Sequence, residues 1–279
     1  MPPEHSPTVR HRRLAAELRR LREVAKLTPA DAAAALGWSK SKLTRFETAA
    51  TRPQPSDVAE MLGLYGGDEA LKFALMQLAR DIRTRGWWAA YRDVLPPSFA
   101  ELENDASEIR SWYVQLIHGL LQTPDYARAL IRNYTHDEAE VDKRLQARIH
   151  RQTILARENA PTLDVILDEA VLRRPVGGRD VMRGQLAALL AAGERPNVSI
   201  RVVPIEIGIY PSIGNGSVIL FGFPRPIDPD VAYIESFAGG IFVEDVGEVR
   251  RCRFELDRIS ETALSEEDSA ALIRAILKE

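Results

Sequence analysis

The chain has 279 residues, 45% hydrophobic and 28% charged, which is ordinary for a globular protein with a sizeable core, and its length favours two domains. No run of 18 or more apolar residues occurs, and the polar, basic residues 1–13 lack the apolar centre of a secretory signal, so we expect neither a membrane span nor export. The single cysteine, Cys252, excludes an internal disulfide and fits a reducing cytoplasm.

Charge is distributed unevenly along the chain. Residues 1–66 contain 11 Lys and Arg against 7 Asp and Glu, a net charge of +4, whereas the remainder contains 26 against 33, a net charge of −7. A basic end on an otherwise acidic chain suits the binding of nucleic acid by that end. A solvated charged surface is the alternative that charge alone leaves open.

The first predicted elements are two helices. Leucines at three- and four-residue spacing form one apolar stripe over residues 8–26, which predicts an amphipathic helix. The second helix begins at Thr28, a good N-cap, with Pro29 at the first helical position, where its missing N–H costs nothing. It ends at Gly37, a residue suited to a left-handed cap.

A third helix is predicted from Lys40 to about Thr48, with Ser39 as its N-cap. Leu43 and Phe46 form its inward face, and a fourth helix begins near Pro55. Short helices joined by a tight glycine-containing turn indicate a helix-turn-helix, the motif whose second helix enters the major groove of DNA.

The stretch LRRLREVAKLTPADAAAALGWSKSKLTRFETAATRPQPSDVAEMLGLYG resembles the Xre family of phage-repressor-like transcription regulators over about residues 14–66. The resemblance includes turn, cap and core positions that fall where the family pattern has them: Ala33, Gly37, Ser39, Leu43, Glu47 and Pro53. Two positions depart from the pattern. Pro29 stands where the family often has Gln, and Lys26 stands in place of a common Gly.

The resemblance implies a role for several side chains. It implies base contacts in the major groove from Lys40, Ser41, Thr44 and Arg45. It implies phosphate contacts from Thr28, Lys42 and Arg52, and a structural ion pair between Arg22 and Glu47 that ties the first helix to the third. For four further arginines, DNA contact and plain solvation both stay open: Arg12, Arg13, Arg19 and Arg20.

The rest of the chain is predicted to mix helices and strands. A long helix over 68–85 leads into helices at Phe99 to Arg110 or beyond, 123–134, 139–158, 181–192, 248–263 and 266–278. Strands are predicted at 198–205, 217–223, 232–237 and 241–244, with a short apolar run at 163–167. We therefore expect an α+β fold overall: an all-α helix-turn-helix domain of about five helices at 1–75, and a larger α+β domain with a mostly antiparallel sheet at 76–279.

A second resemblance covers about residues 86–270. The segments GLLQTPDYARALI at 119–131, RQTIL at 151–155 and LDEAVLRRPVGG at 167–178, with the region of Tyr233, Glu235 and Gly240, resemble the C-terminal domain of a large group of actinobacterial Xre-type regulators. Such proteins are often encoded beside a small partner protein, and some are antitoxin-like. The resemblance implies a sensing or partner-binding module.

Eight residues of this region are candidates for an effector or partner pocket: Trp112, Tyr113, Gln122, Tyr126, Glu169, Arg173, Tyr233 and Glu235. Core or surface packing is the alternative for each. No catalytic motif occurs, and His118, His136 and His150 lack metal-ligand spacing. We therefore expect no enzymatic activity, no cofactor and no metal.

Three functions compete. The first is a sequence-specific regulator of transcription, a homodimer on double-stranded DNA, controlled through its C-terminal domain by a small-molecule effector or a small partner protein. The second is an antitoxin-like protein that chiefly binds a neighbour-encoded small protein, with DNA binding serving autoregulation. The third, an enzyme gated by DNA, lacks a catalytic signature.

Overall fold

The computed structural model describes residues 8–83, 86–224, 229–236 and 239–279. The chain divides into two compact units. One ends at Ala90 and also takes in Pro96–Glu101, and the other comprises Tyr91–Leu95 and Leu102–Glu279. The expected domain boundary at residue 75 lies inside a helix of the first unit. Parts of three predictions, at residues 1–7, 84–85 and Phe237, lie outside the described residues.

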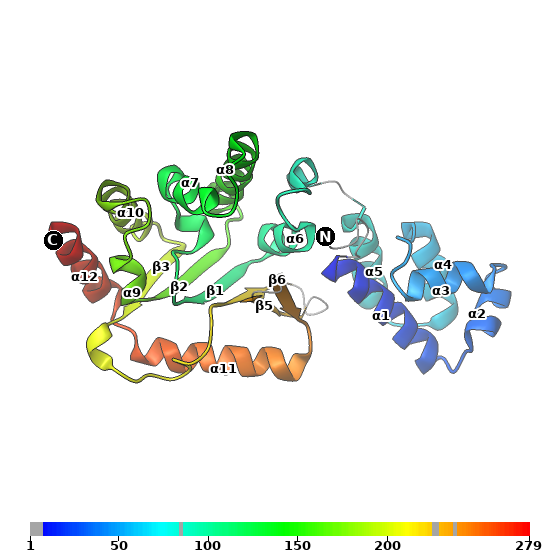
Figure 1. Ribbon diagram of the computed structural model, residues 1–279. Coiled ribbons are helices and arrows are strands. Elements are labelled where there is room, and N and C mark those ends of the chain that lie inside the picture. Colours follow the sequence, from blue (N-terminus) through cyan, green and yellow to red (C-terminus); the bar gives the residue numbers. More distant parts are fainter. Residues whose placement is uncertain (1–7, 84–85, 225–228, 237–238) are drawn as a thin grey trace. The chain divides into compact units, whose positions relative to one another are not determined.

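Five α-helices form the first unit up to residue 83: α1 (Val9–Val24), α2 (Pro29–Ala35), α3 (Lys40–Glu47), α4 (Pro55–Tyr65) and α5 (Glu69–Asp81) (Figure 1). Most of these helices have an N-cap residue whose side-chain oxygen accepts a backbone hydrogen bond. Thr28 and Ser39 each accept a hydrogen bond from a backbone N–H of the first turn of α2 and α3. Gly37, with a φ of 69°, makes the left-handed turn between these two helices. The helical N-terminal region is thus confirmed.

The core of this unit lies where α1 meets α3, α4 and α5. Its fully buried side chains come from all four helices: Leu14, Leu18, Leu43, Val58, Met61, Leu62 and Leu75. Burying each such side chain contributes about 1.5–3 kcal/mol. The packing of the apolar stripe of α1 against the inward residues of α3 therefore determines the orientation of α3.

The second unit is built on a six-stranded sheet in the order β3-β2-β1-β4-β5-β6. The strands are β1 (Glu108–Tyr113), β2 (Thr162–Asp168), β3 (Val198–Val203), β4 (Val218–Gly222), β5 (Val231–Ser236) and β6 (Gly239–Val243). The α-helices are α6 (Pro97–Asp105), which begins in the first unit, α7 (Pro124–Arg132), α8 (Glu138–Gln152), α9 (Glu169–Arg173), α10 (Arg179–Ala192), α11 (Val246–Thr262) and α12 (Glu266–Lys278). Short 3-10 turns occur at Trp87–Tyr91, Gly119–Leu121, Thr153–Ala156 and Ile205–Ile207.

The expectation of a mostly antiparallel sheet is wrong, because the sheet is mixed. β1, β2 and β3 pair in parallel, whereas β4, β5 and β6 continue from β1 as antiparallel neighbours. The expected helix from Phe99 to Arg110 or beyond is also wrong at its end, because α6 ends at Asp105 and Glu108–Tyr113 is a strand. The sequence-based interpretation therefore lacked β1, the strand that pairs in parallel with β2. Once β1 is recognised, α7 and α8 are a helical crossover to β2, and such a crossover joins parallel strands.

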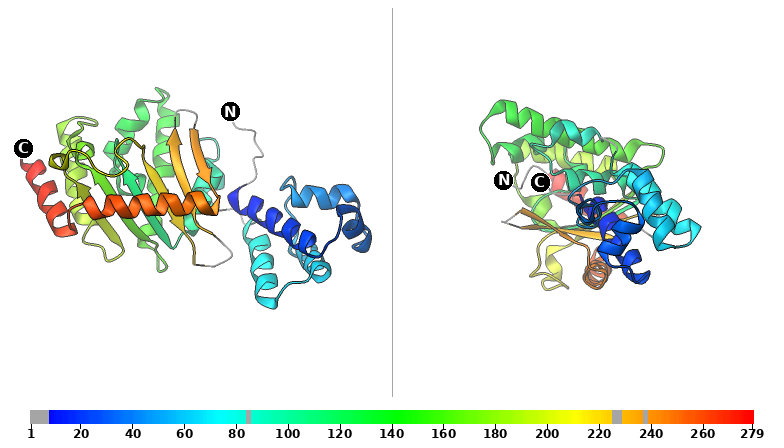
Figure 2. Two further views of the ribbon diagram at one scale, coloured as in Figure 1. Left: turned by 90° about the horizontal axis from the view of Figure 1, so that it is seen from below. Right: turned by 90° about the vertical axis from the view of Figure 1, so that its right-hand side faces the viewer.

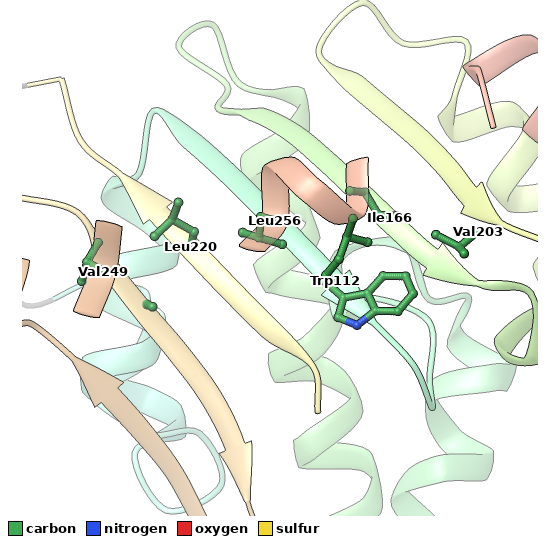
Figure 3. Packing of buried hydrophobic residues seen from close by; sticks show 8 residues of the cluster. Trp112, Ile166, Val203, Leu220, Val249 and Leu256 are labelled. Carbon is green, nitrogen blue, oxygen red and sulfur yellow. The ribbon is translucent and has the colours of Figure 1, made fainter. Parts of the chain in front are cut away.

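Helices cover the two faces of the sheet differently. α11 runs along one face, whereas α7, α8 and α10 lie on the other (Figures 1 and 2). On the α11 face, Trp112, Ile166 and Leu220 from three strands pack against Val249 and Leu256 of α11 (Figure 3). Successive strand residues face opposite sides, so Tyr113, next to Trp112, faces α7 and α8.

No helix of the described segments is long and apolar enough to cross a membrane.

Candidate nucleic-acid interface and a buried polar cluster

Helix α3 presents one apolar and one polar face. Leu43 and Phe46 are buried against the rest of the unit. The four side chains expected to contact bases lie on the opposite side and are all exposed: Lys40, Ser41, Thr44 and Arg45. The structure thus brings these four together on one accessible face of one short helix.

The two cations of this face are available to a ligand. Neither Lys40 nor Arg45 forms an ion pair with any residue that the structure describes. By contrast, Arg19 bonds Glu23 at 2.8 Å and Arg20 bonds Glu17 at 2.6 Å along the exposed side of α1. Polyanion binding by α3 therefore does not require an existing ion pair to break.

Lys42, expected to contact phosphate, is already engaged within the unit. Its Nζ atom lies 2.7 Å from a carboxylate oxygen of Asp57 and 3.7 Å from the ring centroid of Trp38. Asp57 also accepts from the backbone N–H of Gln54 at the start of α4. A phosphate at Lys42 would have to share this ammonium group with the carboxylate.

The other two expected phosphate contacts lie at chain turns. The Thr28 hydroxyl caps α2 and donates to the Asp31 carboxylate at 2.6 Å. Arg52 is exposed, and its carbonyl oxygen accepts from Arg83 at 3.3 Å. Thr28 is at the N-terminus of α2, and a phosphate there would compete with the Asp31 carboxylate for its hydroxyl.

A buried ion pair fixes α3 against α1. The Arg22 guanidinium donates to both carboxylate oxygens of Glu47 at 2.8 and 2.9 Å, and to the Leu27 carbonyl at 2.8 Å. Both side chains are only 6% exposed. The Tyr65 hydroxyl from α4 lies 3.4 Å from Glu47, and burial together with this carboxylate raises the pKa of Tyr65. Three helices therefore meet at one carboxylate.

Four of the eight candidate pocket residues are held in structural contacts: Trp112, Tyr126, Glu169 and Arg173. Trp112 belongs to the core on the α11 face. The buried Tyr126 hydroxyl accepts from the backbone N–H of Ile117. Glu169 is fully buried and accepts from Arg173, which also bonds Glu279. These four side chains therefore pack in the core or hold neighbouring backbone and helices in place.

The other four meet on the α7–α8 face of the sheet. They are Tyr113, Gln122, Tyr233 and Glu235. Further side chains join them that the sequence analysis did not single out: Glu103, His118, Arg148 and Arg151. We call these eight residues the polar cluster. A usable signal for it existed in the sequence, since Arg148 and Gln152 share one face of a predicted helix with the apolar Leu145.

Buried charge dominates the polar cluster. Arg151 forms a two-bond ion pair with Glu103 at 2.7 and 2.8 Å, almost wholly out of solvent. Burial raises the pKa of Tyr113, and the Glu235 carboxylate adds to the shift. Arg148 donates to the amide oxygen of Gln122 at 2.7 Å. Burial and the neighbouring Arg151 charge lower the pKa of Arg148 to about 10.

Other reactive groups are isolated. Across the described residues, no group of three or more His, Cys, Asp or Glu gathers in a way that would hold a metal ion. Cys252 is half-buried on α11, and burial raises the pKa of its thiol. A thiol held in its protonated form is a poor nucleophile.

Comparison with known proteins also divides the chain into two parts, although the second match includes Pro96–Glu101 of the first unit. Residues 13–75 match a helix-turn-helix domain, the class of domain that binds DNA in transcription regulators. Residues 96–275 match a domain of unknown function, DUF5753. No curated protein and no solved structure matches the chain. Because the second match spans more than half of the residues, the chain belongs to the DUF5753 family, here joined to an N-terminal helix-turn-helix domain.

Proposed function

We propose that the protein is a sequence-specific transcription regulator that reads base edges in the major groove with α3. The observation that carries the proposal is the exposed polar face of α3, on which Lys40 and Arg45 stand without ion-pair partners among the described residues. Lys and Arg donate to guanine O6 and N7, and Ser41 and Thr44 suit either base type. The buried Arg22–Glu47 pair holds the helix in one orientation.

The protein acts in this proposal as a homodimer without enzymatic activity. One helix-turn-helix contacts few base pairs, and two copies on half-sites one helical turn apart multiply the affinity. The DUF5753 domain supplies the dimer contacts and the control. A small-molecule effector or small partner protein exerts that control only by binding the DNA-competent and incompetent states with different affinity. The protein works in the compartment that holds the DNA.

Fluorescence anisotropy on the upstream DNA of its own gene tests the proposal. The purified full chain is titrated with this duplex and with a scrambled duplex of the same composition. We expect preference for the native duplex, and a loss of about 1–3 kcal/mol for Lys40→Ala and for Arg45→Ala on that duplex alone. Arg20→Ala is the matched control, because Arg20 is bound to Glu17 on the exposed side of α1.

Equal binding to both duplexes, unchanged by the two α3 variants, would contradict base reading by α3. That result would favour the antitoxin-like alternative, in which the chief ligand of the protein is a small protein encoded nearby. Co-purification of that protein with the full chain distinguishes this case, since a regulator controlled by a small molecule requires no such partner.

A further inference from the structure

The loop between β1 and α7, residues 114–123, is held in one conformation by side chains from three helices. Gln152 of α8 and Gln185 of α10 donate to its backbone carbonyls at 2.7–3.1 Å. The Tyr126 hydroxyl of α7 accepts from its backbone. A rigid loop beyond the carboxyl end of a parallel strand is where α/β sheets bind small ligands. Here that strand, β1, is also where the parallel half of the sheet meets the antiparallel half.

This loop carries a buried hydrogen-bond donor without a partner. His118 is fully buried, and its Nδ1 accepts from the backbone N–H of Leu120 at 3.1 Å. The proton of the neutral ring therefore sits on Nε2, and this atom has no hydrogen-bond partner in the part of the chain that the structure describes. Burial lowers the pKa of His118 to about 3, which keeps the ring neutral. Leaving a buried donor unmet costs about 1–3 kcal/mol.

A second feature of the polar cluster is the Arg148 guanidinium, which has no counter-ion among the described residues. Arg151 is neutralised by Glu103, but Arg148, three residues earlier on α8, meets only the neutral amide oxygen of Gln122. No carboxylate of the described segments lies within ion-pair distance of Arg148. A partly buried guanidinium with free N–H groups matches the two oxygens of a carboxylate or phosphate.

Aromatic side chains lie next to these polar groups. The ring of Tyr113 meets the His118 ring edge-on, with centroids 5.2 Å apart. The Tyr233 ring lies over Gly240, where even a Cβ atom would come within 1.9 Å of the tyrosine oxygen. Glu235 lies two residues after Tyr233 on β5. It is exposed, and its charge acts on Tyr113 and Arg148. Apolar rings with few polar groups are typical of small-molecule sites.

We propose that the polar cluster binds a small molecule through an oxyanion group, which Arg148 receives and to which His118 donates its Nε2–H. Tyr113 and Tyr233 flank the ligand, and the exposed Glu235 favours a ligand that carries a hydrogen-bond donor away from its oxyanion. The site itself does not depend on DNA binding. Only its use as a regulatory input rests on the proposed function.

Thermal unfolding of the full chain in rising inorganic phosphate tests the proposal, at constant ionic strength adjusted with chloride. Every protein carries Arg45→Ala, so that the DNA-reading face contributes little phosphate binding. We expect phosphate to raise the unfolding temperature of this parent, since a ligand that binds the folded state stabilises it. Arg148→Gln should need about tenfold more phosphate for the same rise, which corresponds to about 1.4 kcal/mol.

Two variants make the comparison specific. Arg144→Gln removes another arginine of α8, one that bonds Glu140 at the surface, and should respond to phosphate like the parent. Arg148→Lys keeps the charge but loses the planar pair of N–H donors that binds two oxygens, so it should respond to phosphate more weakly than the parent. This variant keeps the test usable if Arg148→Gln does not fold. An undiminished response in both Arg148 variants would overturn the proposal. DNA binding, measured separately, would then still decide the proposed function.

Discussion

Arg22 of α1 and Glu47 of α3, 25 positions apart in the chain, form a buried ion pair through three hydrogen bonds. The pair lies behind the exposed face of α3 that carries Arg45. Because α3 has only eight residues, its orientation depends on such tertiary contacts rather than on its own helical stability. The Arg22–Glu47 pair therefore contributes both to the stability of the first unit and to the orientation of the exposed face of α3.

Replacing Arg22 by Ala should destabilise the first unit by about 3–5 kcal/mol, because the Glu47 carboxylate would remain buried without its counter-ion. Urea denaturation followed by circular dichroism measures this change. The double variant Arg22→Met/Glu47→Leu should recover most of the loss, since no buried charge remains. Arg19→Ala, which breaks only the exposed bond to Glu23, is the control and should change little. A small effect of Arg22→Ala would show that the pair is not a strong contact.

Replacing Asp57 by Asn should strengthen DNA binding, because it releases the Lys42 ammonium from its 2.7 Å partner. The amide oxygen of Asn can still accept from the backbone N–H of Gln54, so the start of α4 is retained. If Lys42 then meets a phosphate, the slope of log K against log salt steepens by about 0.9. Anisotropy titrations at several salt concentrations measure the slope. In Lys42→Ala, the same Asp57 change should leave the slope unaltered, and equal slopes in all proteins would place Lys42 away from the DNA.

The N-terminal helices could be predicted because their signals are local. Thr28 and Ser39 cap their helices, and Gly37 makes the turn, so the sequence within a few residues determines each boundary. The strand Glu108–Tyr113 lacks such signals. The charge of its Arg110 is compensated by Asp164 of β2 and Asp257 of α11, and both partners are distant in sequence.

The polar cluster was only partly predictable for the same reason. Tyr113, Tyr233 and Glu235 meet because β1 and β5 flank β4 in one sheet, a register that depends on the mixed topology. Periodicity could place Arg148 on the inward side of α8, but it could not show that the guanidinium meets an amide oxygen and no carboxylate of the described residues. Trp112 lies in the core on the α11 face, whereas its neighbour Tyr113 lies in the polar cluster, because adjacent strand residues point to opposite faces.

Replacing Gly240 by Ala should destabilise the second unit by about 1–3 kcal/mol, because the new methyl group would overlap the Tyr233 ring and push it aside. The double variant Gly240→Ala/Tyr233→Ala should show a smaller additional loss from the Gly240 change than the single variant does, since the overlap is gone. Urea denaturation of the four proteins of this cycle gives the coupling. Additive losses would mean that the ring does not rest on Gly240. Gly184→Ala, at a helical position with nothing near the new methyl group, is the control and should not destabilise.

His118 should make the second unit less stable at acidic pH. Its folded-state pKa, about 3, lies below the 6.5 of an exposed histidine, so only the unfolded chain takes up this proton between the two values. The contribution of His118 is therefore complete above pH 6.5 and falls by about 1.4 kcal/mol for each pH unit below it, down to about pH 3. Carboxylates and His11, whose pKa burial also lowers, titrate in the same range, so the test compares two proteins. In His118→Asn the amide oxygen can still accept from Leu120, but nothing titrates. Between pH 7 and pH 5 in urea, the wild-type protein should lose about 2 kcal/mol more stability than this variant, and equal losses would mean that His118 is solvated or protonated in the folded chain.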